Sequence, residues 1–353
     1  MADNIVFVLG AGFTKAFIKD AFTLTDHYPL DHLLSKFSKK QSPYAHMILR
    51  LEQERAKRSD GRFDLERLMT RLDSIMPHDF EKKIIQQLDY LRHDLFFDFV
   101  KRLESVNPQR ALPSELTSLA KWCINHHANC ITFNYDDFFD QALWDVKQEF
   151  TEPYGGVYWH PNSGYGFFCP PADALVQGNN LSMGHSSMLL LKLHGSINWR
   201  VKRGAIAPYQ LDTVHHYDKW SVHNSLAADA DIVKRHKESK RFIVLPVLMK
   251  SDLTDQPTFR LLWDEAYKKL ESATHVIFIG YSMPLTDIPA GFLFGEAIRK
   301  STKIDVVNLS KRKEPKEIQK LISNYQSVMP RLTKKLFDFD GARPWLKKYG
   351  FIT

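Results

Sequence analysis

The sequence predicts an α/β fold in which helices cover a doubly wound, mostly parallel sheet. Short apolar runs rich in β-branched residues recur far apart, and helical patterns lie between several of them. Such near-continuous runs are typical of strands that are buried on both faces. The predicted strands cover residues 5–9, 130–133, 188–193, 242–247, 276–279 and 304–309.

Helical periodicity supports the alternation of strands with helices. From Phe259 to Leu270 the apolar residues follow the i, i+3, i+4, i+7 spacing of an amphipathic helix, which leads into the strand at 276–279. Residues 22–110 contain no convincing strand and are too long for a plain crossover connection. We therefore expect a helical insertion there, which serves either as an assembly surface or as a lid.

The remaining organisation follows from composition along the chain. Residues 145–187 are rich in Gly, Pro and aromatic residues and predict a loop-rich insertion. We expect one catalytic domain over residues 1–330, with both insertions inside it, followed by a C-terminal tail over 331–353.

Cysteine content and charge exclude several classes of protein. The chain has 353 residues and three cysteines with no CxxC pair, so it supplies neither a disulfide framework nor a four-thiolate zinc site, and we expect no metal. The net charge of +7 favours anionic ligands without separating nucleic acid from a dinucleotide. No run of about 18 apolar residues predicts a membrane span, and the chain starts directly in a strand pattern, so we expect a cytoplasmic protein.

A glycine-rich turn follows the first predicted strand. Gly10, Ala11, Gly12, Phe13 and Thr14 lie between that strand and a helical pattern. Glycines at such a turn let the backbone approach a pyrophosphate, and the N–H groups at a helix start attract the anion. The alternative is a tight turn that only needs glycine. Position 15 is a lysine, so the full GxGxxG pattern is absent.

Polar residues end two further strands. Asn134 and Asp136 follow the strand at 130–133, and His194 follows the strand at 188–193 with a glycine beside it. The carboxyl ends of parallel strands border the ligand crevice of doubly wound sheets, which makes these residues candidates for a site. The alternatives are that Asp136 only caps the next helix and that the histidine is structural.

The last two strands also end in small or polar residues. Gly280, Tyr281 and Ser282 follow the strand at 276–279, and Asn308 ends the strand at 304–309. Such residues suit contacts with ribose and phosphate. A proline-terminated turn and a surface asparagine remain the alternatives.

Taken in order, GAGFT, TFNYD, LKLHGSINW, FIGYSMPLTD and VVNLS resemble the sirtuin superfamily. The resemblance is to its bacterial sirtuin-like branch, the NAD-degrading effectors of antiphage defence such as those of HerA-associated and Thoeris-type systems. It implies a Rossmann-like sheet that binds NAD as a substrate. It also implies roles for the residues of these motifs. Asn134 and His194 are the catalytic pair, and Asp136 positions nicotinamide, ribose or the site itself. The residues that hold the dinucleotide are Gly10, Ala11, Gly12, Phe13 and Thr14 at the pyrophosphate, Gly280, Tyr281 and Ser282 at phosphate and ribose, and Asn308 at the adenosine ribose.

The activity implied by the resemblance is NAD+ hydrolysis to nicotinamide and ADP-ribose, in an abortive-infection response to phage. It also implies a homo-oligomer that acts with a separately encoded HerA-type ATPase or another phage-sensing partner, and no membrane. Protein-deacetylating sirtuins usually carry a four-cysteine zinc module and an acidic, aromatic and basic nicotinamide motif, and neither is present here. The alternatives are an NAD-dependent protein deacylase or ADP-ribosyltransferase, and a noncatalytic nucleotide sensor or nucleic-acid-binding module.

Overall fold

A computed structural model describes the chain at residues 4–21, 30–58, 64–74, 76–105, 111–149, 159–169, 186–202, 214–216, 239–247, 250, 252–309 and 314–353. The chain divides into two compact units. Unit 1 comprises Met1–Asp20, Asn107–Ile243 and Asp252–Thr353, and unit 2 comprises Ala21–Val106 and Val244–Ser251. Each unit is described below by itself.

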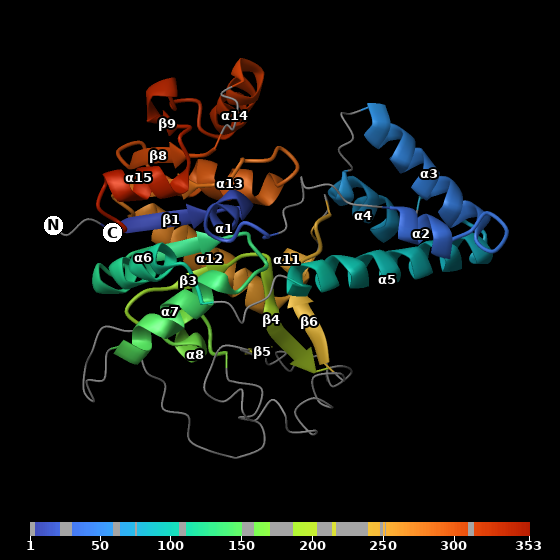
Figure 1. Ribbon diagram of the computed structural model, residues 1–353, viewed down its shortest axis with the longest axis horizontal. Coiled ribbons are helices and arrows are strands. Elements are labelled where there is room, and N and C mark those ends of the chain that lie inside the picture. The colour runs from blue at the N-terminus through green and yellow to red at the C-terminus, as the bar shows by residue number, and fades with distance from the viewer. Residues whose placement is uncertain are drawn as a thin grey trace, which may run out of the picture. The chain divides into compact units, whose positions relative to one another are not determined.

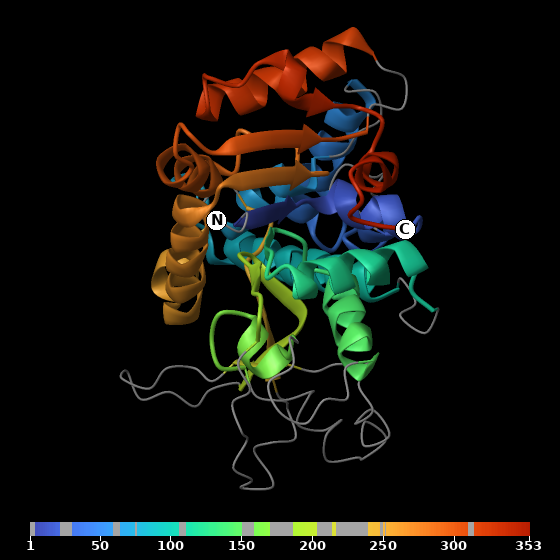
Figure 2. The ribbon, with the colours of Figure 1, turned by 90° about the vertical axis from the view of Figure 1, so that its left-hand side faces the viewer.

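Unit 1 is built on a six-stranded sheet in which every neighbouring pair of strands is parallel (Figures 1 and 2). The strand order is β3-β2-β1-β7-β8-β9. The strands are β1 (Ile5–Leu9), β2 (Asn129–Thr132), β3 (Leu190–Lys192), β7 (His275–Ile279), β8 (Lys303–Val307) and β9 (Phe337–Asp338). The predicted doubly wound, mostly parallel sheet is therefore confirmed.

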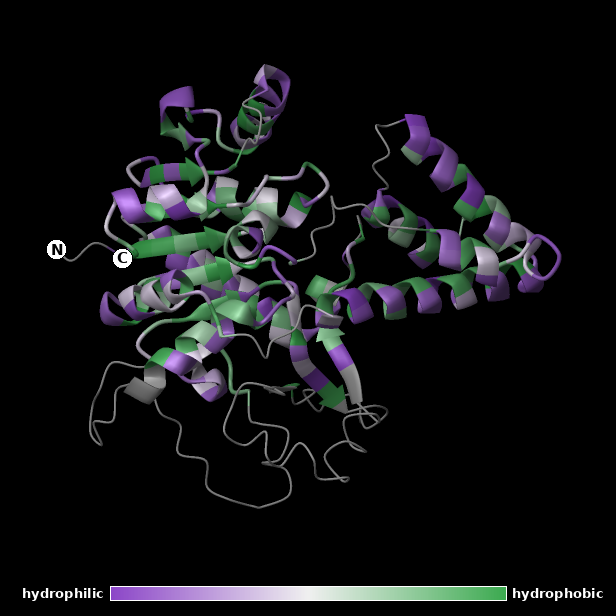
Figure 3. Ribbon diagram, viewed as in Figure 1, coloured by the Kyte–Doolittle hydropathy of each residue, from purple (hydrophilic) through white to green (hydrophobic). Residues whose placement is uncertain are grey.

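The apolar character of the central strands explains their place in the sheet. Residues 6–8 of β1 and 276–279 of β7 are fully buried, and β1 is hydrophobic along its length in Figure 3. Because successive side chains of a strand point to opposite faces, such strands need cover on both sides. Phe7 packs against Trp122 on one face, while Phe278 packs against Phe294 on the other.

Helices supply that cover, as Figure 2 shows. On the Phe7 side lie α6 (Ser114–Asn125) and α15 (Ala342–Lys348), and on the Phe278 side lie α13 (Ile288–Ala297) and α14 (Pro315–Val328). The remaining described helices of unit 1 are α1 (Ala11–Phe17), α7 (Phe138–Glu149), α8 (Pro161–Gly164), α11 (Asp252–Asp255), α12 (Pro257–Ser272) and the short 3-10 helix η2 (Lys334–Leu336). The amphipathic helix predicted from Phe259 onward is α12.

A second sheet of three strands corrects one prediction. Its order is β5-β4-β6, formed by β5 (Val214–His216), β4 (Gly195–Lys202) and β6 (Ser239–Ile243), and both pairs are antiparallel. The apolar run at 242–247 was expected in the parallel sheet, yet its strand residues belong to β6. An apolar run shows that a strand is buried but not which neighbour it pairs with, so the pattern could not decide between the two sheets.

The C-terminal segment, which the sequence predicts to be a tail, packs onto unit 1. It contributes β9 to the edge of the parallel sheet and α15 to one of its faces. Trp345 and Phe351 stack with their ring centroids 5.6 Å apart, and Phe351 lies edge-on to Phe7. The apolar residues of this segment therefore complete the core.

The secondary-structure elements of unit 2 are all helices within its described residues. The helices are α2 (Asp31–Lys36), α3 (Pro43–Arg58), α4 (Leu65–Asp73) and α5 (Lys82–Ser105). A buried carboxylate ties three segments together, because Asp79 accepts hydrogen bonds from both terminal nitrogens of Arg71 at 2.9 Å and from the Tyr44 hydroxyl at 3.0 Å. The hydrogen bonds and the opposite charge of Arg71 hold the Asp79 pKa below its usual value although burial opposes this.

The predicted loop-rich insertion at 145–187 falls mostly outside the described residues. Its first residues, 145–149, are the last turn of α7, and residues 161–164 form α8. No helix in the described part of the chain is both long and apolar enough to cross a membrane.

Candidate active site

The sheet changes its direction of winding at β1, whose neighbours are β2 on one side and β7 on the other. In open α/β sheets ligands bind beyond the carboxyl ends of the strands at such a switch point. The five sequence motifs end β1, β2, β3, β7 and β8, which are adjacent strands. The structure thus places the predicted site residues at the carboxyl ends of neighbouring strands in one sheet.

Two glycine turns meet at the switch point through their backbones. The Gly10 N–H donates to the Ile279 carbonyl and the Gly12 N–H donates to the Gly280 carbonyl, each at 3.0 Å. A Cβ on Gly10 would lie 2.5 Å from the Gly280 oxygen, which is too close for any side chain. Gly280 also has a φ of 63°, a left-handed conformation that favours glycine. These glycines are therefore needed for the close approach of two loops.

This packing limits what the first glycine turn offers a dinucleotide. The Gly12 N–H is already used within the protein, whereas Ala11 and Gly12 themselves are exposed at the start of α1. The Phe13 ring is buried against Phe17 and Phe139, with centroids 5.1 and 5.6 Å away. Any contact of Phe13 with a ligand would therefore come from its main chain.

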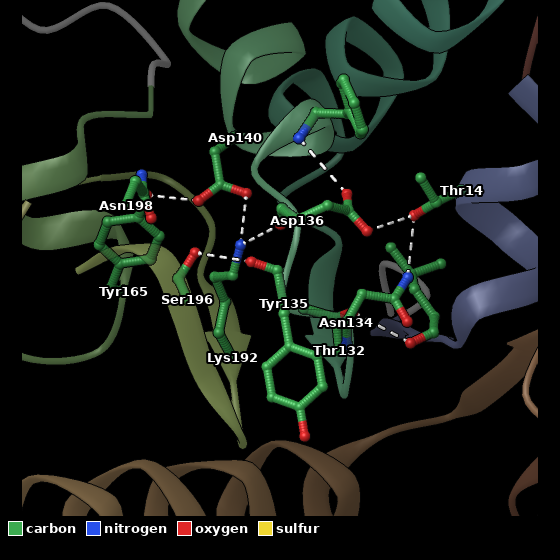
Figure 4. Close-up of polar contacts among 12 residues, drawn as sticks. Thr14, Thr132, Asn134, Tyr135, Asp136, Asp140, Tyr165, Lys192, Ser196 and Asn198 are labelled. Carbon is green, nitrogen blue, oxygen red and sulfur yellow. Dashed lines mark hydrogen bonds and ion pairs between the residues drawn. The ribbon is translucent and has the colours of Figure 1, made fainter. Parts of the chain in front are cut away.

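Asn134 and Thr14 form one hydrogen-bonded chain with Asp136 (Figure 4). The Asn134 side-chain nitrogen donates to the Gly10 carbonyl at 2.9 Å and to the Thr14 hydroxyl at 3.0 Å. The Thr14 hydroxyl in turn donates to Asp136 Oδ2 at 3.0 Å. The Gly10 carbonyl can only accept, so the side-chain nitrogen of Asn134 must face it. The side-chain oxygen of Asn134 is then the acceptor that this residue offers to another group.

Asp136 is half-buried, and the pKa of its carboxyl is raised to about 6. Burial is the main cause, because it penalises the charged form, and the Lys192 charge and the Thr14 hydrogen bond counteract part of the rise. Asp136 Oδ1 also accepts from the Phe138 N–H at the start of α7, at 3.4 Å. The capping role is therefore present together with the bond to Thr14.

His194 lies beyond β3 at the position that corresponds to Asn134 beyond β2. Thr132 pairs with Lys192, and each of the two site residues comes two positions after its member of this pair. The main chain is fixed here, since the Leu193 N–H donates to the Thr132 main-chain carbonyl at 2.9 Å and the Trp263 indole N–H donates to the Leu193 carbonyl at 3.1 Å. Asn134 and His194 thus end adjacent strands at the same level.

A carboxylate that sequence reasoning did not include lies beside this histidine. Asp287 Oδ2 is 3.8 Å from His194 Nε2 and accepts from the Tyr281 hydroxyl at 3.2 Å, and all three side chains are buried. Tyr281 also stacks on Phe133 at 4.7 Å, so its ring lies in the core. The only sequence signal for Asp287 was its place at the end of the GYSMPLTD motif.

The loop after β7 and the end of β8 are tied together. The Asn308 side-chain nitrogen donates to the Tyr281 carbonyl at 3.2 Å. Ser282 is exposed, and Met283 after it has a φ of 48°, which is uncommon for a residue with a side chain. Backbone strain of this kind is often found at ligand-binding loops.

The structure also bears on metal binding. Across the described ranges, no group of three or more His, Cys, Asp and Glu side chains is placed to hold a metal ion. Cys123, Cys130 and Cys169 are buried thiols that form no disulfide. Burial and the neighbouring Cys123 thiol raise the Cys130 pKa well above its usual value, so it stays protonated.

Comparison with known proteins assigns the chain to a family. A model of the SIR2-like domain matches residues 128–325, which is more than half of the 353 residues. No curated protein matches the chain. Among solved structures, one of Sir2Tm bound to a propionylated peptide is 12% identical, with a TM-score of 0.39 and coverage of 98% of this chain and 93% of that one.

A second structure, of a Sir2 protein with an inhibitor, 2′-O-acetyl-ADP-ribose and a deacetylated p53 peptide, is 12% identical with a TM-score of 0.41. The match covers 98% of this chain and 94% of that one. Both similarities are weak, and the family assignment rests on the domain match. That match supports an NAD-dependent activity of the sirtuin type. The chain belongs to the SIR2-like domain family.

Proposed function

We propose that the protein is an NAD+ glycohydrolase that cleaves the bond between nicotinamide and ribose. The observation that carries the proposal is the position of Asn134 and His194 at the carboxyl ends of the adjacent strands β2 and β3, beside the glycine turns at the switch point. Such a site suits a dinucleotide, with its glycosidic carbon facing an imidazole and a carboxamide.

The chemistry needs charge stabilisation more than proton donation. The nicotinamide of NAD+ is already cationic, so the C1′–N bond breaks with its electron pair moving to the ring nitrogen, and nicotinamide leaves as a neutral molecule. The ribosyl centre becomes oxocarbenium-like, as in other glycoside cleavages, and water adds to C1′. The water gives up one proton, so the products are nicotinamide, ADP-ribose and H+.

The site residues can divide these tasks. His194 would accept the proton from water or from a ribose hydroxyl that relays it, since imidazole is suited to proton transfer near neutral pH. Asn134 presents its carbonyl oxygen because its N–H groups are used by Gly10 and Thr14, so it would accept a hydrogen bond from a ribose hydroxyl or the water. Asp136 orients this amide through Thr14 and places negative charge near the cationic centre.

The remaining predicted residues would hold the dinucleotide. The exposed start of α1 at Ala11 and Gly12 would approach the pyrophosphate, and Ser282 would close over phosphate and ribose. Asn308 would contact the adenosine ribose, for which its amide would have to share or exchange its present bond to the Tyr281 carbonyl. Phe13 and Tyr281 contribute through main-chain atoms and packing in this proposal.

We further propose, from the sequence resemblance, that this activity depletes NAD in the cytoplasm of phage-infected cells and that a homo-oligomer acts with a HerA-type ATPase or another sensing partner. Unit 2 is the proposed assembly surface, and a lid is the alternative. Gel filtration with light scattering tests the oligomer, and added HerA-type ATPase tests the partner. A strict monomer that is fully active alone would overturn both points.

The hydrolase proposal is tested by incubating the protein with NAD+ and separating the products by chromatography. We expect nicotinamide and ADP-ribose in equal amounts, and a loss of about 10²- to 10⁴-fold in turnover for His194→Ala. His126→Ala, an exposed histidine at the end of α6, is the matched control and should keep wild-type turnover. Unchanged cleavage in His194→Ala would contradict the assignment.

The same assay distinguishes the alternatives. A protein deacylase would release nicotinamide only when an acyl-lysine peptide is present, and an ADP-ribosyltransferase would leave ADP-ribose attached to a protein acceptor. A noncatalytic module would show salt-sensitive nucleic-acid binding, or NAD binding, with no turnover at all.

A further inference from the structure

We propose that Lys192 is a positioning residue for the site, which holds the main chain at Asp136 and places a positive charge beside that residue. The inference rests on the proposed function for its meaning in catalysis, since Asp136 belongs to the proposed machinery. Its physical content, a lysine that fixes the position and the charge of Asp136, can be tested without any turnover.

The contacts of Lys192 are made by a side chain that is fully buried. Its Nζ donates to the main-chain carbonyl of Asp136 at 2.5 Å and to Asp140 Oδ2 at 3.0 Å. Lys192 belongs to β3, whereas both partners follow β2 (Figure 4). The ammonium group therefore clamps the segment that carries Asn134 and Asp136 to the neighbouring strand.

This segment has left the parallel sheet, so other groups must hold its carbonyls. The Tyr135 carbonyl accepts from the Ile197 N–H at 2.9 Å and from the Ser196 hydroxyl at 3.4 Å. The next carbonyl, that of Asp136, accepts from Lys192. Two successive carbonyls beside the site are thus fixed by β3 and β4, and the second depends on one charged side chain.

The carboxylate partner of Lys192 is itself anchored. Asp140 Oδ1 accepts from the Tyr165 hydroxyl at 2.5 Å, and the Asn198 side-chain nitrogen donates to that hydroxyl at 3.4 Å. Burial and the nearby Asp140 charge raise the Tyr165 pKa well above its usual value, so the phenol remains a donor. The ion pair is therefore held in one geometry by residues of three segments: Asp140 on α7, Tyr165 in the turn after α8, and Asn198 on β4.

A purely structural role would not require a charge at this position. Burying an ion pair is costly, and well-packed apolar residues of similar volume often give equal or greater stability. A lysine aimed at Asp136 has a further effect, because its charge opposes the rise that burial causes in the Asp136 pKa. The charge thus favours the ionised carboxylate that accepts from Thr14 and orients Asn134.

The other groups that face Asp136 set the expected sign of each substitution. Thr14 on α1 stabilises the charged form by its hydrogen bond, whereas the charges of Asp137 and Asp140 raise the Asp136 pKa. Removing Lys192 should therefore raise this pKa, and removing only the Asp140 charge should lower it. Lys192 has the larger effect of the pair, so removing both charges should still raise it.

The test compares Asp140→Asn, Lys192→Met and the double variant Lys192→Met/Asp140→Asn. The double variant guards against misfolding, because it removes both charges of the buried pair and its new amide oxygen would still accept from the Tyr165 hydroxyl. Lys268→Met/Asp264→Asn is the matched control, since it removes an ion pair on α12 whose side chains are each 59% exposed. Circular dichroism confirms folding of each variant.

The readouts are the pH profile of NAD+ cleavage and the titration of the Asp136 carboxyl by ¹³C NMR, assigned with Asp136→Asn. We expect the acid limb of the profile and the titration midpoint to move up by about one pH unit in Lys192→Met, by less in the double variant, and down in Asp140→Asn. The control should leave both in place.

If neither the wild-type protein nor any variant cleaves NAD+, the proposed function fails while the NMR titration still tests Lys192. If the Asp136 midpoint stays at its wild-type value in both folded Lys192 variants, the proposal is overturned. If the midpoint moves but the NAD+ cleavage profile does not, Lys192 controls the charge of Asp136 without positioning the site, and the proposal is overturned as well.

Discussion

Replacing Gly280 by alanine should destabilise unit 1 far more than a glycine substitution elsewhere with similar backbone geometry. A Cβ at this position would lie 2.0 Å from the Phe13 nitrogen and 2.3 Å from the Gly12 carbonyl carbon. Both are main-chain atoms, so no rotamer change can relieve the overlap. The two loops at the switch point must therefore separate by about 1 Å or more to regain ordinary contact distances.

The cost can be worked from the structure. A left-handed φ costs alanine roughly 1–2 kcal/mol, and alanine regains about 0.4–1 kcal/mol by restricting the unfolded chain. Separation of the loops also breaks the hydrogen bonds that Gly10 and Gly12 donate across the gap, each worth about 1 kcal/mol. We expect a net loss of about 3 kcal/mol, which corresponds to a fall in melting temperature of about 6–9 °C for a unit of this size.

Gly350→Ala is the matched control, because Gly350 has a φ of 74° and nothing lies within 4 Å of its added Cβ. It carries the same conformational cost without the overlap, and should cost about 1 kcal/mol or less. Differential scanning calorimetry of both variants gives the comparison. Melting temperatures within about 2 °C of each other would refute the reasoning that Gly280 exists for the close approach of two loops.

Further predictions concern charge and hydrogen bonding. The folded-state pKa of Asp136 is raised to about 6, so the contribution of this carboxyl to stability is present at low pH and lost as pH rises through that value. Between about pH 4.5 and 7, the free energy of unfolding in urea should fall by on the order of 2 kcal/mol more in the wild type than in Asp136→Asn. An equal pH dependence of the two unfolding free energies would contradict this. In unit 2, Asp79→Asn leaves Arg71 without its buried carboxylate and should lower the free energy of unfolding by about 3 kcal/mol. Asp73→Asn, at an exposed ion pair, should lower it by less than about 0.5 kcal/mol. Hydrogen exchange of the unit 2 helices measures both losses, and equal losses would contradict the prediction. Thr14→Val should lower NAD+ turnover by about 10- to 100-fold, because Asn134 and Asp136 lose the hydroxyl that bonds to both. Thr14→Ser keeps the hydroxyl and should retain most of the turnover. Equal turnover in the two variants would show that the Thr14 hydroxyl has no role in the site.

The sequence was a good guide to what is local. The strands β1, β2, β7 and β8 were visible as apolar runs, and polar residues directly after them marked the edge of the sheet where the site lies. It was a poor guide to strand partners, as the run at 242–247 shows, because β6 pairs with β4 in a separate antiparallel sheet. Pairing depends on which segments meet in space, and the pattern of one segment does not contain that information.

The same distinction holds within the site. The sequence by itself determined that Asn134, Asp136 and His194 follow buried strands, because strand burial and the end of a strand are properties of a few consecutive residues. Only the tertiary structure decided which groups face them: Lys192 at the main chain of Asp136, and Asp287 beside His194, far along the chain from it. Such contacts join residues that are distant in the sequence, and packing alone fixes the distances and burial that set their charges.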